Sequence, residues 1–133
     1  MSINRDRWTA RHFGFRWITG LMFCALMMPT LAHHSGAMFD DKQSLTLTGT
    51  VKQFQWTNPH CWLQVVVPGA SGSTEWSVEM GSPSQLFRGG WRPKILHAGE
   101  AIVVVIHPMR DGSKAGLFVS ATHGDGTAIS SAG

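Results

Sequence analysis

Hydrophobic and polar residues alternate with a period of two along most of the chain after residue 44, which is typical of half-buried β-strands. The alternation predicts strands at residues 45–56, 61–67, 74–80, 101–109 and 115–123. In the first of these segments the phase slips after Val51. This slip predicts a bulge or bend in the strand, and Gly49 would ease it.

The segments between these strands carry turn and helix signals. Residues 57–60 contain an Asn-Pro pair that favours a turn, and residues 68–73 and 110–113 have loop composition. Ser82 before Pro83, followed by Gly89 and Gly90, predicts a short helix at residues 82–90. Residues 124–133, rich in Gly, Ser and Ala, are expected to form a flexible tail.

Three strands, a short helix and two further strands, with a bent first strand, favour one architecture. The order predicts a mainly β protein, a small five-stranded OB-like Greek-key barrel with one short helix between strands three and four. An open antiparallel sheet covered by the helix is the alternative. The barrel domain is expected to span residues 33–123.

Residues 1–32 have the three-part layout of a cleavable secretory signal. Four arginines precede an apolar run of 12 residues at 17–28, and the small residue Ala32 follows. A membrane-spanning helix needs about 20 apolar residues, so this run is too short for a stable anchor. We therefore expect cleavage after Ala32 and a periplasmic or secreted protein.

Removal of this signal changes the charge of the protein. The whole chain has 11 basic and 8 acidic residues, but four arginines and Asp6 lie in the signal, which leaves seven of each. Phosphate binding depends on clustered Lys and Arg. The neutral balance therefore predicts a small ligand or a periplasmic protein as the partner, and no nucleic acid.

One cysteine, Cys61, remains in the mature chain, so an internal disulfide is not possible. Cys61 is in phase with Leu63 and Val65, which predicts burial as a small hydrophobic residue. Glu75 and Glu79 share the outer face of the third strand and are interpreted as solubilising. The sequence shows no catalytic constellation, so we expect a protein that is not an enzyme.

Cleavage after Ala32 would place His33 at the N-terminus, where its α-amine and imidazole can chelate one metal ion. Nitrogen donors favour Cu(II), so copper is the possible cofactor. The third donor is not fixed by the sequence, and the candidate metal residues are His33, His34, His60 and His107, with His123 also considered. The alternative is that the histidines merely belong to a solvated chain end.

The Asn-Pro turn lies between two tryptophans, which predicts an aromatic-walled ligand groove. Its candidate residues are Trp56, Asn58, His60 and Trp62. The alternative is that His60 hydrogen-bonds to the turn backbone and fixes its shape.

Several short segments together resemble one known family. They are His33-His34-Ser35, Phe39-Asp40, residues 47–51, residues 56–60 and Gly89-Gly90-Trp91. They resemble the domain of unknown function 6152 family of small exported bacterial proteins, over nearly all of residues 33–123. The resemblance implies a periplasmic location and a small β-barrel, and it brings no catalytic residues.

Together these features favour an exported, non-catalytic periplasmic binding or accessory module. A periplasmic copper-binding protein that uses His33 is the alternative, and a thiol- or histidine-dependent enzyme is the least favoured.

Overall fold

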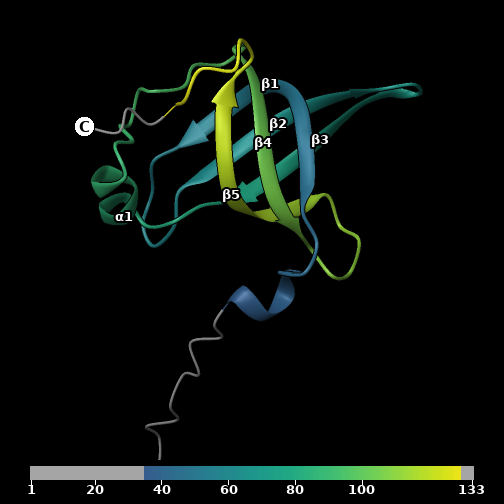
Figure 1. Ribbon diagram of the computed structural model, residues 1–133, viewed down its shortest axis with the longest axis horizontal. Coiled ribbons are helices and arrows are strands. Elements are labelled where there is room, and N and C mark those ends of the chain that lie inside the picture. The colour runs from purple at the N-terminus through teal and green to yellow at the C-terminus, as the bar shows by residue number, and fades with distance from the viewer. Residues whose placement is uncertain (1–34, 130–133) are drawn as a thin grey trace, which may run out of the picture. The chain divides into compact units, whose positions relative to one another are not determined.

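In the computed structural model, which describes residues 35–129, five strands form a closed barrel in the order β1-β2-β3-β5-β4 (Figure 1). The elements are η1 (Ser35–Met38), β1 (Leu45–Gln55), β2 (Trp62–Gly69), β3 (Gly72–Glu79), α1 (Pro83–Arg88), β4 (Ala101–Pro108) and β5 (Ala115–His123). The predicted mainly β, five-stranded OB-like barrel with one short helix is confirmed. The alternative, an open sheet, is wrong.

Strand β1 pairs with two neighbours. Its residues 45–50 pair with β4 and its residues 50–55 pair with β2, with a register shift between Val51 and Gln53. The slip in the hydrophobic pattern therefore marks a real irregularity. A Cβ atom on Gly49 would lie 2.2 Å from the carbonyl oxygen of Val66, so the close approach of the two strands requires glycine there.

The barrel closes through a parallel pair. Strand β5 pairs antiparallel with β4 and parallel with β3, from Ser77↔Ala115 to Glu79↔Leu117. Parallel strands need a crossover connection, and the segment that holds α1 and β4 supplies it. Among the described residues, no helix is long and apolar enough to span a membrane.

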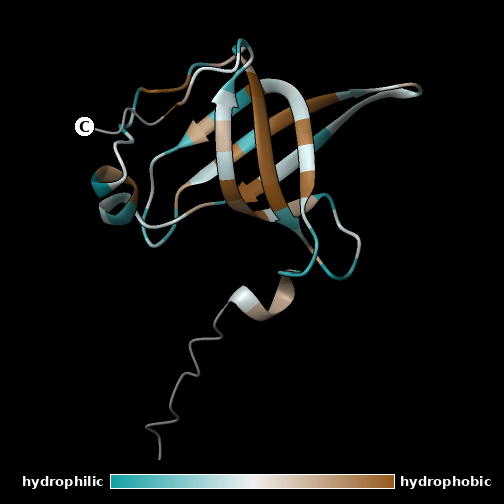
Figure 2. Cartoon of the chain, viewed as in Figure 1, coloured by the Kyte–Doolittle hydropathy of each residue, from teal (hydrophilic) through white to brown (hydrophobic). Residues whose placement is uncertain are grey.

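The core lies inside the barrel and is built from the inward residues of every strand. The apolar residues concentrate on the strands, and the connections are more polar (Figure 2). Among the members that are fully or nearly fully buried are Val51, Cys61, Leu63, Val65, Val78, Met80, Ile102, Val104 and Ile106. Cys61 is thus buried as predicted. The buried apolar residues of the described chain lie between Phe39 and Ile129, after the predicted cleavage site.

One connection differs from the sequence prediction. Residues 68–73 were expected to be a loop, but β2 and β3 continue through most of it and leave a two-residue turn at 70–71. Gly72, with φ of 125°, takes the backbone conformation that this tight turn needs. The predicted helix is confirmed, and a capping box between Ser82 and Gln85 starts it.

The C-terminal boundary at His123 is corrected by the structure. The backbone N–H of His123 donates to the carbonyl of Thr127 at 2.8 Å, and Thr122 forms a bridge with Ala128. Ile129 is only 3% exposed and belongs to the core. Residues 124–129 are therefore part of the domain and not a tail. Residues 130–133 and the predicted signal at 1–32 lie outside the described residues.

Candidate functional site

The Asn-Pro turn between β1 and β2 is held by its own backbone and by the end of β3. Cys61 N–H donates to Gly81 O at 3.0 Å, and Met80 N–H donates to Cys61 O at 2.9 Å. Within the turn, Thr57 Oγ1 donates to the His60 carbonyl at 2.9 Å, and the Asn58–Pro59 peptide bond is cis. The backbone and Thr57 hydrogen bonds hold the turn against the end of β3.

The His60 imidazole instead contacts Glu79, the last residue of β3. His60 Nδ1 lies 2.8 Å from Glu79 Oε1, and the side chains are 39% and 7% exposed. Burial of a carboxylate costs free energy unless a partner compensates it, and the imidazole is such a partner. The contact restrains the half-exposed ring at its Nδ1 atom.

Strand register extends this pair into a row across the outside of the barrel. Trp62 pairs with Glu79, Glu79 with Leu117, and Leu117 with His107. Directly paired residues point to the same side of a sheet, and their inward neighbours, such as Leu63 and Ile106, are fully buried. The row therefore lies on the outer face and spans three strand spacings, about 14 Å.

Amide side chains border this row beside Trp62. Gln55 pairs with Trp62, and Gln53 pairs with Gln64 two residues along the strands. Gln64 Nε2 donates to Ser77 Oγ at 3.1 Å and to Gln55 Oε1 at 3.4 Å. The outer surface of β1, β2 and β3 therefore presents uncharged hydrogen-bonding groups next to an indole.

The other end of the row reaches a groove at one end of the barrel. His107 Nδ1 lies 2.7 Å from the carbonyl oxygen of Gln43, and Gln43 lines this groove of about 570 Å³. Trp76 and Lys114 also line it, with Lys114 Nζ 5.1 Å from the centre of the indole ring. We call the row, His60 and this groove the binding face.

The four predicted groove residues do not all meet. His60 and Trp62 are both neighbours of Glu79, but Trp56 packs edge-on against Phe54, with ring centroids 5.9 Å apart. Phe54 in turn contacts the buried Trp91 at 5.8 Å, so Trp56 belongs to the edge of the core. Asn58 is exposed in the turn.

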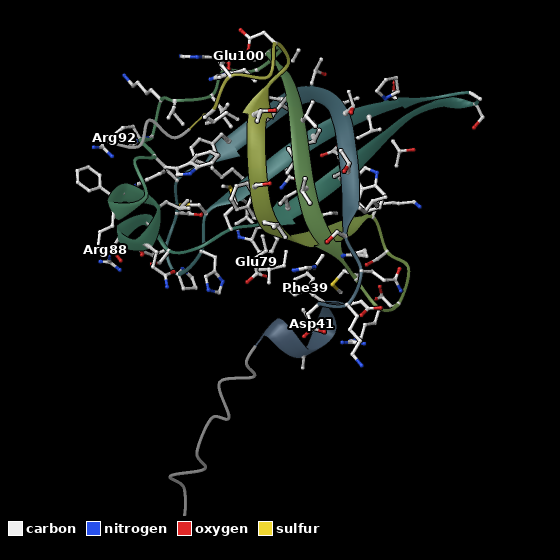
Figure 3. All side chains as sticks on the ribbon, viewed as in Figure 1. Phe39, Asp41, Glu79, Arg88, Arg92 and Glu100 are labelled. Carbon is white, nitrogen blue, oxygen red and sulfur yellow. The ribbon has the colours of Figure 1, made fainter. Side chains whose placement is uncertain are left out.

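Glu79 is a residue of this candidate site that the sequence prediction does not include. The sequence predicts a solubilising outer residue, but the Glu79 side chain is only 7% exposed, and it lies at the end of β3 (Figure 3). Alternation along β3 correctly gives its face. The turn between β1 and β2 brings His60 against this outer face and helps to bury Glu79. The alternation of residues along β3 does not predict where that turn lies.

The predicted metal residues fall into two groups. His33 and His34 lie outside the described residues, so the copper hypothesis remains a prediction. His60 and His107 lie on one face but are separated in the row by Glu79 and Leu117. Within residues 35–129, no group of three or more His, Cys, Asp or Glu side chains could hold a metal ion.

Cys61 lies next to the turn but is not placed for chemistry. It is fully buried, and its Sγ lies 3.9 Å from the Thr57 carbonyl oxygen. Burial raises the pKa of the Cys61 thiol, which disfavours the reactive thiolate.

Comparison with known proteins identifies the family. Residues 22–120 match the family of unknown function DUF6152, and the chain belongs to it. No curated protein matches the chain. Among solved structures, the chain is similar to a mitochondrial single-stranded DNA-binding protein from S. cerevisiae, with 10% sequence identity and a TM-score of 0.45. The match covers 61% of this chain and 93% of that protein.

This similarity contradicts the expectation that nucleic acid is excluded as a partner. The expectation rested on the neutral net charge of the mature chain. The net charge does not show how the charged residues are distributed over the surface. Proteins that bind single-stranded nucleic acid combine local positive charge with aromatic side chains that stack on the bases. The exclusion of nucleic acid was therefore wrong.

Proposed function

We propose that this protein is an exported, non-catalytic binding module that holds an extended oligosaccharide on the binding face. The observation that carries the proposal is the half-exposed His60 imidazole held at 2.8 Å by the buried Glu79 carboxylate. The pair is positioned, partly accessible and in register with Trp62. Fixed polar groups beside an aromatic side chain are typical of ligand sites.

The chemistry of the face favours a hydroxyl-rich ligand. Amide, hydroxyl and imidazole groups can both donate and accept hydrogen bonds, and the Trp62 indole offers a flat surface to a sugar ring. The cations around the face are largely neutralised within the protein. Lys52 Nζ contacts Glu75 at 2.5 Å, and Arg110 lies 3.6 Å from Asp40 and 3.4 Å from Asp41.

The extended form of the ligand follows from the geometry. The row runs about 14 Å across four strands and then meets the groove at Gln43. A ligand of several units would contact His60 and Trp62 at one end and Lys114 at the other.

A binding role is favoured over a catalytic one by the surroundings of His60. The neighbouring thiol, Cys61, is buried and has a raised pKa. Export is supported by the layout of residues 1–32 and by the resemblance to exported proteins.

Calorimetric titration of the chain that begins at His33 tests the proposal. The probes are maltohexaose, cellohexaose, N-acetylchitohexaose and an oligothymidylate. We expect one saccharide to bind, and His60→Ala and Trp62→Ala each to weaken it about tenfold, since a lost hydrogen bond or stacking contact is worth roughly 1–2 kcal/mol.

His97→Ala is the matched control, because His97 Nδ1 lies at the same distance, 2.8 Å, from Glu100 Oε1 in a more exposed pair away from the binding face. Saccharide binding that His60→Ala leaves unchanged, or an absence of saccharide binding, contradicts the proposal. If only the oligothymidylate binds, the ligand is a nucleic acid and not a saccharide. If His60→Ala weakens that binding, the binding face is still the site of binding.

A further inference from the structure

The segment from residue 81 to residue 99 concentrates positive charge. It contains Arg88, Arg92 and Lys94 and no acidic residue, whereas the other described residues contain four basic and seven acidic side chains. All three cations are exposed. Within the described part of the chain, none of the three has an ion-pair partner. The neutral domain is thus divided into a positive region around α1 and a negative remainder.

Backbone carbonyls and an aromatic ring hold one of these cations in place. Arg92 Nη1 donates to the carbonyls of Phe87 at 3.1 Å and Trp91 at 2.7 Å. Its guanidinium carbon lies 4.0 Å from the centre of the Phe87 ring, and Phe87 is 55% exposed. Arg88 and Arg92 lie on the side of α1 away from the strands (Figure 3).

We infer that this region, the α1 patch of Phe87, Arg88, Arg92 and Lys94, docks the domain onto an anionic lipid surface. Basic side chains are attracted to anionic headgroups. An exposed aromatic side chain beside them can enter the boundary between headgroups and acyl chains. The α1 patch combines both features, and it shares no residue with the binding face.

Charge complementarity favours a surface over a long polyanion. A nucleic-acid strand that continued from the patch onto the barrel would meet the net-negative remainder of the described chain, which carries four basic and seven acidic side chains. A flat anionic surface needs to touch only the α1 patch. Arg92 already covers one side of the Phe87 ring, which leaves less of it for base stacking.

Vesicle sedimentation of the chain that begins at His33 tests the inference. One set of vesicles contains phosphatidylcholine alone, and the other contains equal parts of phosphatidylcholine and phosphatidylglycerol. We expect binding to the second set only, weakened by added salt. Arg88→Gln/Lys94→Gln should weaken it about 25-fold, because each cation near the surface contributes about fivefold. Phe87→Ser should weaken it about fivefold.

Lys42→Gln/Lys52→Gln is the matched control, because it removes two exposed charges outside the α1 patch, and it should bind nearly as well as the parent. No vesicle binding, or binding that the two double variants weaken equally, overturns the inference. So does binding to phosphatidylcholine alone. If the patch variants abolish binding of an oligothymidylate but vesicles are not bound, the occupant is a nucleic acid and not a lipid surface.

Discussion

Gly49 is the residue whose missing side chain most directly shapes the barrel. An added Cβ would lie 2.2 Å from Val66 O and 2.9 Å from Val66 C, both backbone atoms. We expect Gly49→Ala to lower the free energy of unfolding by about 2–3 kcal/mol, since overpacking forces the backbone to move. Urea denaturation measures the change. Gly36→Ala, with nothing within 4 Å of its Cβ, should stay within about 0.5 kcal/mol; equal losses in both variants would contradict the account.

At the level of single residues, the sequence predicts those features that depend only on nearby residues in the chain. The slip after Val51 and the burial of Cys61 both follow from alternation, and both are confirmed. The burial of Glu79 and the packing of Trp56 against Phe54 depend on contacts between segments. Strand register and turn geometry determine those contacts. The alternation of hydrophobic and polar residues predicts neither of them.

Residues 124–129, which follow β5, pack against the edge of the core through Ile129. We expect Ile129→Ala to reduce the free energy of unfolding by about 2–4 kcal/mol, because it removes a buried side chain and leaves a cavity. The measurement is again urea denaturation, with Ala128→Ser as a control at the exposed neighbouring position. An Ile129→Ala loss below about 0.5 kcal/mol would show that the segment adds little.

At the level of elements, all five strands and α1 could be predicted because alternation and capping are local signals. The sequence prediction misses the segment at 124–129 because its first four residues are Gly, Asp, Gly and Thr, which are typical of loops, and its burial rests on one isoleucine. The loop at 68–73 was misjudged for a similar reason. Its Pro and Gly residues are compatible with strand ends, where a turn of two residues suffices.

The stability of the whole domain should depend on pH through three carboxyl groups on its connections. The side chain of His97 lowers the pKa of Glu100, the backbone of Ser113 lowers that of Asp111, and the side chain of Thr127 lowers that of Asp125. A lowered pKa in the folded state gives stability that is present above the unfolded value, about 4. This stability is lost as the pH falls through the folded values.

We therefore expect the urea midpoint to fall as the pH is lowered from about 5 to 3. Asp111→Asn/Asp125→Asn should show a smaller decrease over the same interval. An identical pH dependence in this variant and in the parent would contradict the assignment.

The parallel pairing of β3 with β5 has a consequence for the time at which the protein folds. A chain that emerges from its N-terminus can form β1, β2 and β3 once residue 79 is free. However, β1 still lacks β4 and β3 still lacks β5, so both outer strands have open hydrogen-bonding edges. Completion waits until residue 123 has emerged. If the chain is exported in extended form, as proposed, its barrel would close only after nearly all of the chain has crossed the membrane.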